Sequence, residues 1–183
     1  LKIGVMINAS ELINYKTKNP IKNIKLLIKN KNDSKIHFVR VACHYEEIPK
    51  AIKVSNWLKK NGYTVGFNIM QIAEKSDLEI EHVGKICSSY PIDILYFADS
   101  MGSLGGEKIS KIISLIKKNW KGDIGIHTHD NMNMAIANTQ TAIDNGVVWV
   151  DSTVTGMGRG PGNAKTEYLV IKFQEILKRK SNI

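Results

Sequence analysis

The stretch Gly125-Ile126-His127-Thr128-His129 does most to decide the fold. Successive side chains of a β-strand point to opposite faces, so Gly125, His127 and His129 share one face, while Ile126 points to the other. One face is therefore small and polar and the other is apolar. Two imidazoles on one face are natural ligands for a divalent metal ion. Two hydrogen-bonded histidines at a strand end are the simpler alternative.

Six apolar runs of this kind alternate with helical patterns along the chain. We predict strands at residues 2–8, 36–44, 64–71, 92–99, 123–129 and 147–155. Helices are predicted at residues 47–61, 107–119, 133–145 and 165–179, with a further helix capped by Asp77. Pro49 suits a first turn, and Gly62 and Gly146 suit helix ends. Apolar strands joined by helices form a parallel sheet.

Two architectures fit this pattern: an open doubly wound sheet and part of a (β/α)8 barrel. The same alternation of small or polar and apolar residues recurs in other predicted strands. The small or polar face carries Gly4, Met6 and Asn8, then Arg40, Ala42 and His44, then Gly66, Asn68 and Met70. An open sheet covered by helices on both sides would be apolar on both faces. The alternation therefore favours a barrel, whose interior opens to a polar mouth.

The composition indicates one globular domain. The chain has 183 residues, of which 43% are hydrophobic and 23% are charged. It begins with Leu1 rather than Met, so we expect a fragment or a processed chain. It has no apolar run of membrane-spanning length and no signal-peptide pattern. Cys43 and Cys87 are far apart, which predicts two free core cysteines and a cytoplasmic protein.

The net charge of +9 raises the question of a nucleic-acid partner. The lysines are scattered over polar helix faces, and no basic stretch is interleaved with aromatic residues. A solvated, lysine-rich surface is therefore favoured over nucleic-acid binding. A positive field of this kind also attracts small anions such as keto acids.

Polar residues gather where the predicted strands end, which is where both architectures place their active sites. They are Asn8, His44, Gln71, Asp99, His127, His129 and Asp151. A glycine-rich loop, TGMGRGPGN at residues 155–163, follows the last strand. It does not satisfy the dinucleotide-binding pattern. It suits an anion cradle or a mobile lid, and equally a loop that simply needs several positive-φ turns.

Four stretches together resemble the metal-dependent aldolase/lyase/synthase superfamily. They are IHTHDN (126–131), AIANT (135–139), VDSTVTGMG (150–158) and PGNAKTE (161–167). The superfamily includes 4-hydroxy-2-oxovalerate aldolase, hydroxymethylglutaryl-CoA lyase and isopropylmalate synthase. Two further stretches, YFADSMG (96–102) and VGFNIM (65–70), are most similar to the hydroxy-oxovalerate aldolase branch. The resemblance extends over residues 2–170.

The resemblance implies a (β/α)8 (TIM) barrel in which the six strands are the third to the eighth. Residues 1–183 would then be a single incomplete TIM-barrel domain. It also implies that His127, His129 and Asn163 bind Mn²⁺ or Mg²⁺. The implied activity is that of a carbon–carbon lyase or aldolase, or of an acyl-transfer synthase. It acts on an α-keto acid such as pyruvate through a metal-stabilised enolate.

The chain also departs from the family pattern. The family's first strand carries an Arg-Asp pair, and no such strand precedes Leu1, so we expect the chain to lack full activity by itself. The reactive cysteine of the lyase glycine loop is replaced in a region that holds Arg159 and Pro161. The expected partners are a small keto acid and either a second copy or a partner enzyme subunit.

Within this scheme we predict that Gly158, Arg159 and Gly160 bind substrate as the loop closes. His44 and Asp99 are predicted to line the site or, equally, to form hydrogen bonds at strand ends. Asp151 is predicted to support the residues that touch the ligand, or to be structural and orient neighbouring backbone. The alternative function is a non-catalytic barrel paralogue that serves as a binding or regulatory module.

Overall fold

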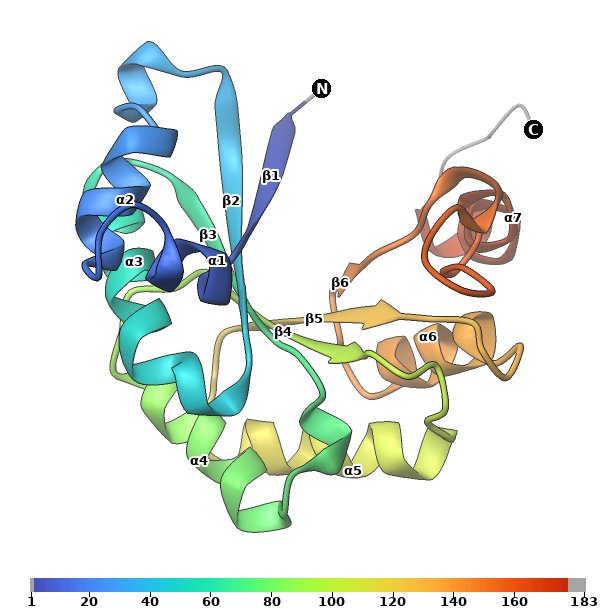
Figure 1. Ribbon diagram of the computed structural model, residues 1–183. Coiled ribbons are helices and arrows are strands. Elements are labelled where there is room, and N and C mark those ends of the chain that lie inside the picture. Colours follow the sequence, from blue (N-terminus) through green and yellow to red (C-terminus); the bar gives the residue numbers. More distant parts are fainter. Residues whose placement is uncertain (1, 178–183) are drawn as a thin grey trace.

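The strands form one parallel sheet that follows the chain order. The computed structural model describes residues 2–177. Its strands are β1 (Ile3–Asn8), β2 (Ile36–Cys43), β3 (Thr64–Ile69), β4 (Ile94–Asp99), β5 (Asp123–Thr128) and β6 (Trp149–Val150). They pair in the order β1-β2-β3-β4-β5-β6, and every pair is parallel. The sheet curls, and helices cover its outer face (Figure 1).

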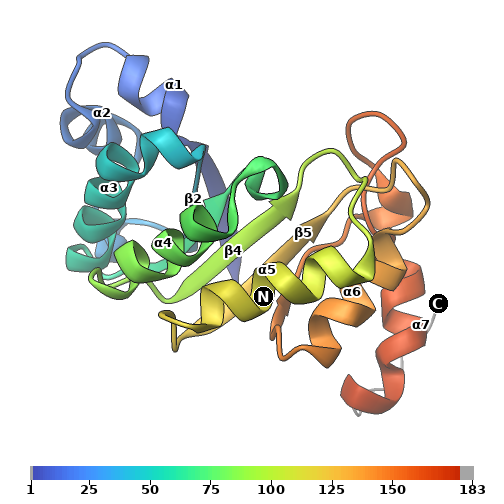
Figure 2. The same ribbon diagram turned by 90° about the horizontal axis from the view of Figure 1, so that it is seen from below.

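Within residues 2–177, seven helices connect or follow the strands. They are α1 (Ala9–Asn14), α2 (Pro20–Leu27), α3 (Ile48–Lys60), α4 (Asp77–Ser88), α5 (Gly106–Lys117), α6 (Ala135–Asp144) and α7 (Thr166–Leu177). Figure 2 shows α3, α4, α5 and α6 following one another around the outside of the sheet. Short 3-10 turns lie at Lys31–Asp33, Tyr45–Glu47, Ile72–Glu74 and Val154–Gly156. No helix within residues 2–177 is long and apolar enough to cross a lipid bilayer.

Local sequence signals explain where several helices begin and end. Gly62 and Gly146 follow α3 and α6 with φ of 87° and 82°, as predicted for helix stops. The predicted N-cap of α4, Asp77, lies one residue beyond the observed one. Ser76, not Asp77, is the N-cap, and its backbone N–H donates to the Glu79 carboxylate at 2.8 Å in a capping box. Of the predicted 165–179 helix, residues 178–179 lie outside the described part.

The outer face of the sheet forms the main hydrophobic core. Outward apolar side chains of the central strands are buried there, and the four isoleucines of α5 pack against them: Val39, Val41, Cys43, Val65, Phe67, Ile69, Leu95, Phe97, Ile124 and Ile126, with Ile109, Ile112, Ile113 and Ile116. The predicted apolar face is therefore confirmed. Cys43 and Cys87 are free and buried, as expected.

The inner face holds aromatic rings that glycines accommodate. A Cβ on Gly125 would lie 2.3 Å from the Tyr96 ring, and one on Gly66 would lie 2.6 Å from the Phe38 ring. Phe38 on β2 stacks on Trp149 on β6, with ring centroids 6.1 Å apart and planes 7° apart. Since β2 and β6 are not neighbours in the sheet, this contact crosses the interior of the curl.

The sixth strand was predicted too long. Residues 147–155 were expected to be extended, yet β6 contains only Trp149 and Val150. Beyond β6 the chain leaves β5, because the Thr153 N–H donates to the Ala164 carbonyl at 3.0 Å instead of continuing the ladder. Thr155 then adopts a left-handed φ of 57°, which no regular strand allows. Asp151, the residue after β6, still donates its backbone N–H to the Ile126 carbonyl of β5 at 3.1 Å, and the chain departs from β5 only beyond it.

Candidate metal and substrate site

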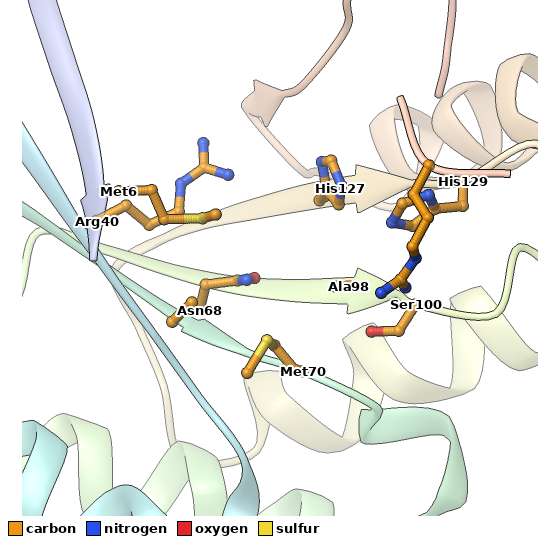
Figure 3. A pocket seen from close by; sticks show the side chains of 10 residues that line it. Met6, Arg40, Asn68, Met70, Ala98, Ser100, His127 and His129 are labelled. Atoms are coloured by element: carbon orange, nitrogen blue, oxygen red, sulfur yellow. The ribbon is translucent and has the colours of Figure 1, made fainter. Parts of the chain in front are cut away.

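A cavity of ≈ 310 Å³ opens on the inner face, toward the carboxyl ends of the strands. Figure 3 shows side chains from β1 to β5 facing it, with Arg40, His127 and His129 among them. The full lining is Met6, Arg40, Ala42, Asn68, Met70, Ala98, Ser100, His127, His129 and Arg159. The residues of this set on β1, β2, β3 and β5 belong to the face that alternation assigned to the interior. Ala98 on β4 faces the same way, because register pairs Ala98 with His127, as it pairs Met6 with Arg40.

His127 and His129 meet in this cavity. Their ring centroids are 4.9 Å apart, and the rings are edge to face at 89°. The His127 Nδ1 lies 3.0 Å from the Asp151 carboxylate. Because a carboxylate only accepts, Nδ1 is the donor in this contact, which leaves Nε2 as the ring nitrogen for a metal. A carboxylate behind a histidine is the arrangement that orients metal-binding imidazoles.

The surroundings of His129 favour the neutral form of its imidazole. Burial lowers its pKa, and the nearby His127 and Arg159 lower it further. A neutral imidazole is the form that binds a metal. His129 also forms an antiparallel bridge with Asn163, so the end of β5 holds the glycine loop beside the imidazole pair.

Asn163 has a fixed amide whose oxygen lacks a partner. Its Nδ2 donates to the Met157 carbonyl at 3.0 Å, and a Cβ on Gly158 would lie 2.3 Å from that nitrogen. The Asn163 Oδ1 is buried and accepts no hydrogen bond from the described residues. An orphaned buried acceptor costs about 1–3 kcal/mol, which a bound cation would offset.

These observations test whether the site suits a divalent ion. Two imidazoles and an unsatisfied amide oxygen can hold a divalent ion as three donors that carry no negative charge. Within residues 2–177, no group of three or more His, Cys, Asp or Glu side chains converges as a metal cluster. The negative charge that a tight site needs is therefore not among these three donors.

Arg40 is the functional residue that sequence reasoning missed. Its guanidinium lies 4.0 Å from the centre of the Tyr96 ring and donates to both oxygens of Asp151, with Nη2 2.7 Å from Oδ1. Asp151 was predicted to support the residues that touch the ligand or to orient backbone, and its carboxylate joins two side chains, Arg40 and His127. The available signal was a charged residue on the inward face of a strand, since a buried charge needs a partner.

The charges of this network stabilise each other. Burial alone would raise the pKa of Asp151, yet the hydrogen bonds from Arg40 and His127 hold that pKa below its ordinary value. Burial likewise opposes the charge on Arg40, and the Asp151 carboxylate more than compensates, so the pKa of Arg40 is raised. Both groups are therefore ionised at neutral pH.

Two predicted site residues serve local structure instead of lining the cavity. His44 begins the Tyr45–Glu47 turn, and its backbone N–H donates to the Glu47 carboxylate at 2.9 Å. The Asp99 carboxylate is buried and accepts from the backbone N–H groups of Ser103 and Leu104 at 3.1 and 3.3 Å. Neither side chain lies in the cavity wall. Each residue instead takes part in the turn that follows its strand.

The three loop residues predicted to bind substrate are placed differently from one another. Gly158 packs on the Asn163 amide. Arg159 lines the main cavity and an adjoining one, and Gly160 lines only the adjoining one. Gly160 and Gly162 have φ of 62° and 98°, so the glycines also serve the backbone turns of the alternative interpretation.

A curled parallel sheet with an imidazole pair at its carboxyl ends defines a protein with a partial barrel fold. The sequence model of the HMGL-like family matches residues 5–183, and the chain belongs to this family. It is 33% identical over 144 residues to "4-hydroxy-2-oxovalerate aldolase 4" of Rhodococcus opacus (strain B4), covering 78% of this chain and 41% of that one. The aldolase of Geobacillus thermodenitrificans (strain NG80-2) is 32% identical, covering 77% of this chain and 41% of that one.

Solved structures confirm the fold. The N-terminal domain of a Bacteroides vulgatus protein assigned as an aldolase has a TM-score of 0.79 and 26% identity, covering 99% of this chain and 58% of that one. An HMG-CoA lyase from Bacillus subtilis has a TM-score of 0.76 and 17% identity, covering 98% and 64%. The predicted partial TIM barrel is therefore confirmed. The chain spans about two fifths of the length of the curated relatives it matches.

Proposed function

We propose that the chain carries the metal-binding half of the active site of a carbon–carbon lyase or aldolase, or of an acyl-transfer synthase, that acts on an α-keto acid. The observation that carries this proposal is the imidazole pair, backed by Asp151 and flanked by the unsatisfied Asn163 oxygen. The relatives named as aldolases support the reaction class.

His127, His129 and Asn163 would hold the ion, which is Mn²⁺ or Mg²⁺. When bound, it supplies Lewis-acid stabilisation of the negative charge that develops as the carbon–carbon bond breaks or forms. Asp151 holds His127 in the tautomer that binds. The Gly158–Gly160 loop segment contributes substrate contacts at the cavity mouth.

The surroundings of the pair favour an anionic substrate. The cavity wall contains Arg40 and Arg159 and no carboxylate residue. Asp151 already neutralises Arg40, so Arg40 fixes the imidazole geometry and adds a weaker positive potential. The small inward residues Ala42 and Ala98 leave room for a short acid beside the histidines. A keto acid the size of pyruvate fits this combination of charge and space.

The experiment is proton exchange at the methyl group of pyruvate, followed by ¹H NMR in D₂O with Mg²⁺ or Mn²⁺ and the full-length protein. We expect exchange that His127→Ala reduces by about 100-fold or more, since it removes one ligand and the partner of Asp151. His82→Ala is the matched control, because His82 is exposed and bonds only to Tyr45 at 2.9 Å among the described residues.

Two outcomes would decide against the proposal. Exchange that is unchanged by His127→Ala would show that the chemistry lies elsewhere. Absence of exchange in the wild type, with the metal bound, would favour the binding or regulatory module.

A further inference from the structure

A second cavity of ≈ 370 Å³ adjoins the first at the mouth of the curl. The two cavities share Ser100, His129 and Arg159, so a ligand at the imidazole pair has direct access to the second space. The rest of its wall consists of Gln71, Met101, Asn131 and Gly160. The second cavity therefore continues the proposed keto-acid site away from the imidazole pair.

The wall of the second cavity has an uncompensated positive charge. Arg159 is exposed, and no carboxylate of residues 2–177 forms an ion pair with its guanidinium. Its backbone carbonyl accepts from the Gly162 N–H at 3.2 Å, but its side chain makes no hydrogen bond within that range. Arg40, the other arginine at the site, is in contrast neutralised by Asp151. No acidic residue lines the second cavity. A free guanidinium in such a wall presents its planar fork to an anion.

The neutral groups of this wall add donors in a fixed arrangement. Gln71 is a non-glycine residue with a left-handed φ of 52°, and its backbone N–H donates to the Ser100 Oγ at 3.0 Å. This bond occupies a lone pair of Ser100 and leaves the hydroxyl proton free to donate. A residue held in a sparsely populated conformation by its surroundings is a mark of a preorganised site.

We propose that the second cavity binds a carboxylate at the far end of the substrate, with Arg159 as the residue that selects it. The inference rests on the proposed function. It assigns the substrate class as a 4-hydroxy-2-oxo diacid, whose keto-acid end lies at the imidazole pair and whose second carboxylate pairs with Arg159.

The reaction balances without a further reactant. The C3–C4 bond breaks, the 4-hydroxyl loses its proton, and C4 becomes an aldehyde that still bears the second carboxylate. The bonding electron pair stays on C3, which takes up a proton to give the methyl group of pyruvate. The products are pyruvate and a carboxylate-bearing aldehyde, and the reverse reaction is the aldol addition.

The test compares two ligands that differ only at the far end. 4-Hydroxy-2-oxoglutarate has a terminal carboxylate where 4-hydroxy-2-oxopentanoate has a methyl group. Binding of each to the full-length protein with Mg²⁺ is measured by isothermal titration calorimetry. We expect the diacid to bind about 10- to 100-fold more tightly, the range of a charge-assisted hydrogen-bonded pair. Arg159→Gln should abolish this preference, because it should weaken binding of the diacid about 10- to 100-fold more than binding of the pentanoate.

Lys50→Gln is the matched control, since it removes one positive charge from an exposed position on α3 and should leave the preference intact. Equal affinity of the wild type for the two ligands, or a preference that survives Arg159→Gln, would overturn the assignment of Arg159. The pentanoate would still bind in those cases, so the proposed function would stand. If neither ligand binds the wild type, the proposed function fails together with this inference.

Discussion

Replacing Asp151 by leucine tests the charge network that crosses the curled sheet. The Asp151 side chain is 20% exposed and that of Arg40 is 14% exposed, so the pair is largely withdrawn from water. The substitution leaves the Arg40 guanidinium without its acceptor and His127 without its orienting carboxylate. Removing one partner of a buried ion pair costs about 3–5 kcal/mol. Because both side chains keep some contact with water, we expect about 3 kcal/mol.

The double variant Arg40→Met, Asp151→Leu separates the lost attraction from the stranded charge. Once both charges are gone, no buried ion lacks a partner, and apolar replacements of similar volume are often nearly neutral. The Arg40 contact with the Tyr96 ring is also lost, which costs about 0.5–2 kcal/mol. We expect the double variant to be destabilised by about 1 kcal/mol, less than Asp151→Leu alone.

The assay is urea unfolding followed by far-ultraviolet circular dichroism at pH 7, with the free energy of unfolding extrapolated to water. The expected loss for Asp151→Leu corresponds to a fall in melting temperature of about 6–12 °C for a domain of this size. The reasoning is refuted if Asp151→Leu lies within about 0.5 kcal/mol of the wild type. It is also refuted if the double variant loses the sum of the two single effects, since coupled residues do not add.

Two glycine substitutions and the pH dependence of stability test other parts of the structure. Gly158→Ala should weaken Mn²⁺ binding, measured by electron paramagnetic resonance, because the new Cβ would lie 2.3 Å from the Asn163 amide nitrogen. Gly125→Ala should cost about 1–3 kcal/mol in urea unfolding, because its Cβ meets the Tyr96 ring. The lowered pKa of His129 predicts stability that is complete above about pH 6.5 and declines as the pH falls toward the folded-state pKa; His129→Gln should remove that decline.

Each of these three predictions has an outcome that would contradict it. Gly105→Ala is the control for the glycine variants, since nothing lies within 4 Å of its Cβ position; an equal effect there would show that the close contacts are irrelevant. If the wild type and His129→Gln have the same pH dependence of unfolding between pH 7 and pH 5, His129 does not stay neutral by burial.

The alternation of side chains along the strands was enough to predict most of the fold. It assigned His127 and His129 to the interior with Ala42 and Asn68, and all four line the cavity. Local rules also placed the ends of α3 and α6, because a glycine with positive φ stops a helix within a few residues. Sequence pattern succeeded where the cause is local.

Sequence pattern failed where the role of a residue depends on partners far away in the chain. Arg40 and Asp151 are 111 residues apart, and only the curl of the sheet brings them together. The short β6 has the same origin, since the Ala164 carbonyl, not a strand neighbour, takes the Thr153 N–H. His44 and Asp99 were assigned from their position at strand ends, where turn formation and site formation use the same residue types.

The most direct test of the account is the hyperfine signature of nitrogen in protein-bound Mn²⁺. Electron spin echo envelope modulation of the full-length protein should show coupling to two imidazole nitrogens. His127→Ala and His129→Ala should each reduce this to one, while His82→Ala keeps both. Tightly bound Mn²⁺ without imidazole coupling, or coupling that both cavity variants leave unchanged, would contradict the claim that this histidine pair holds the metal.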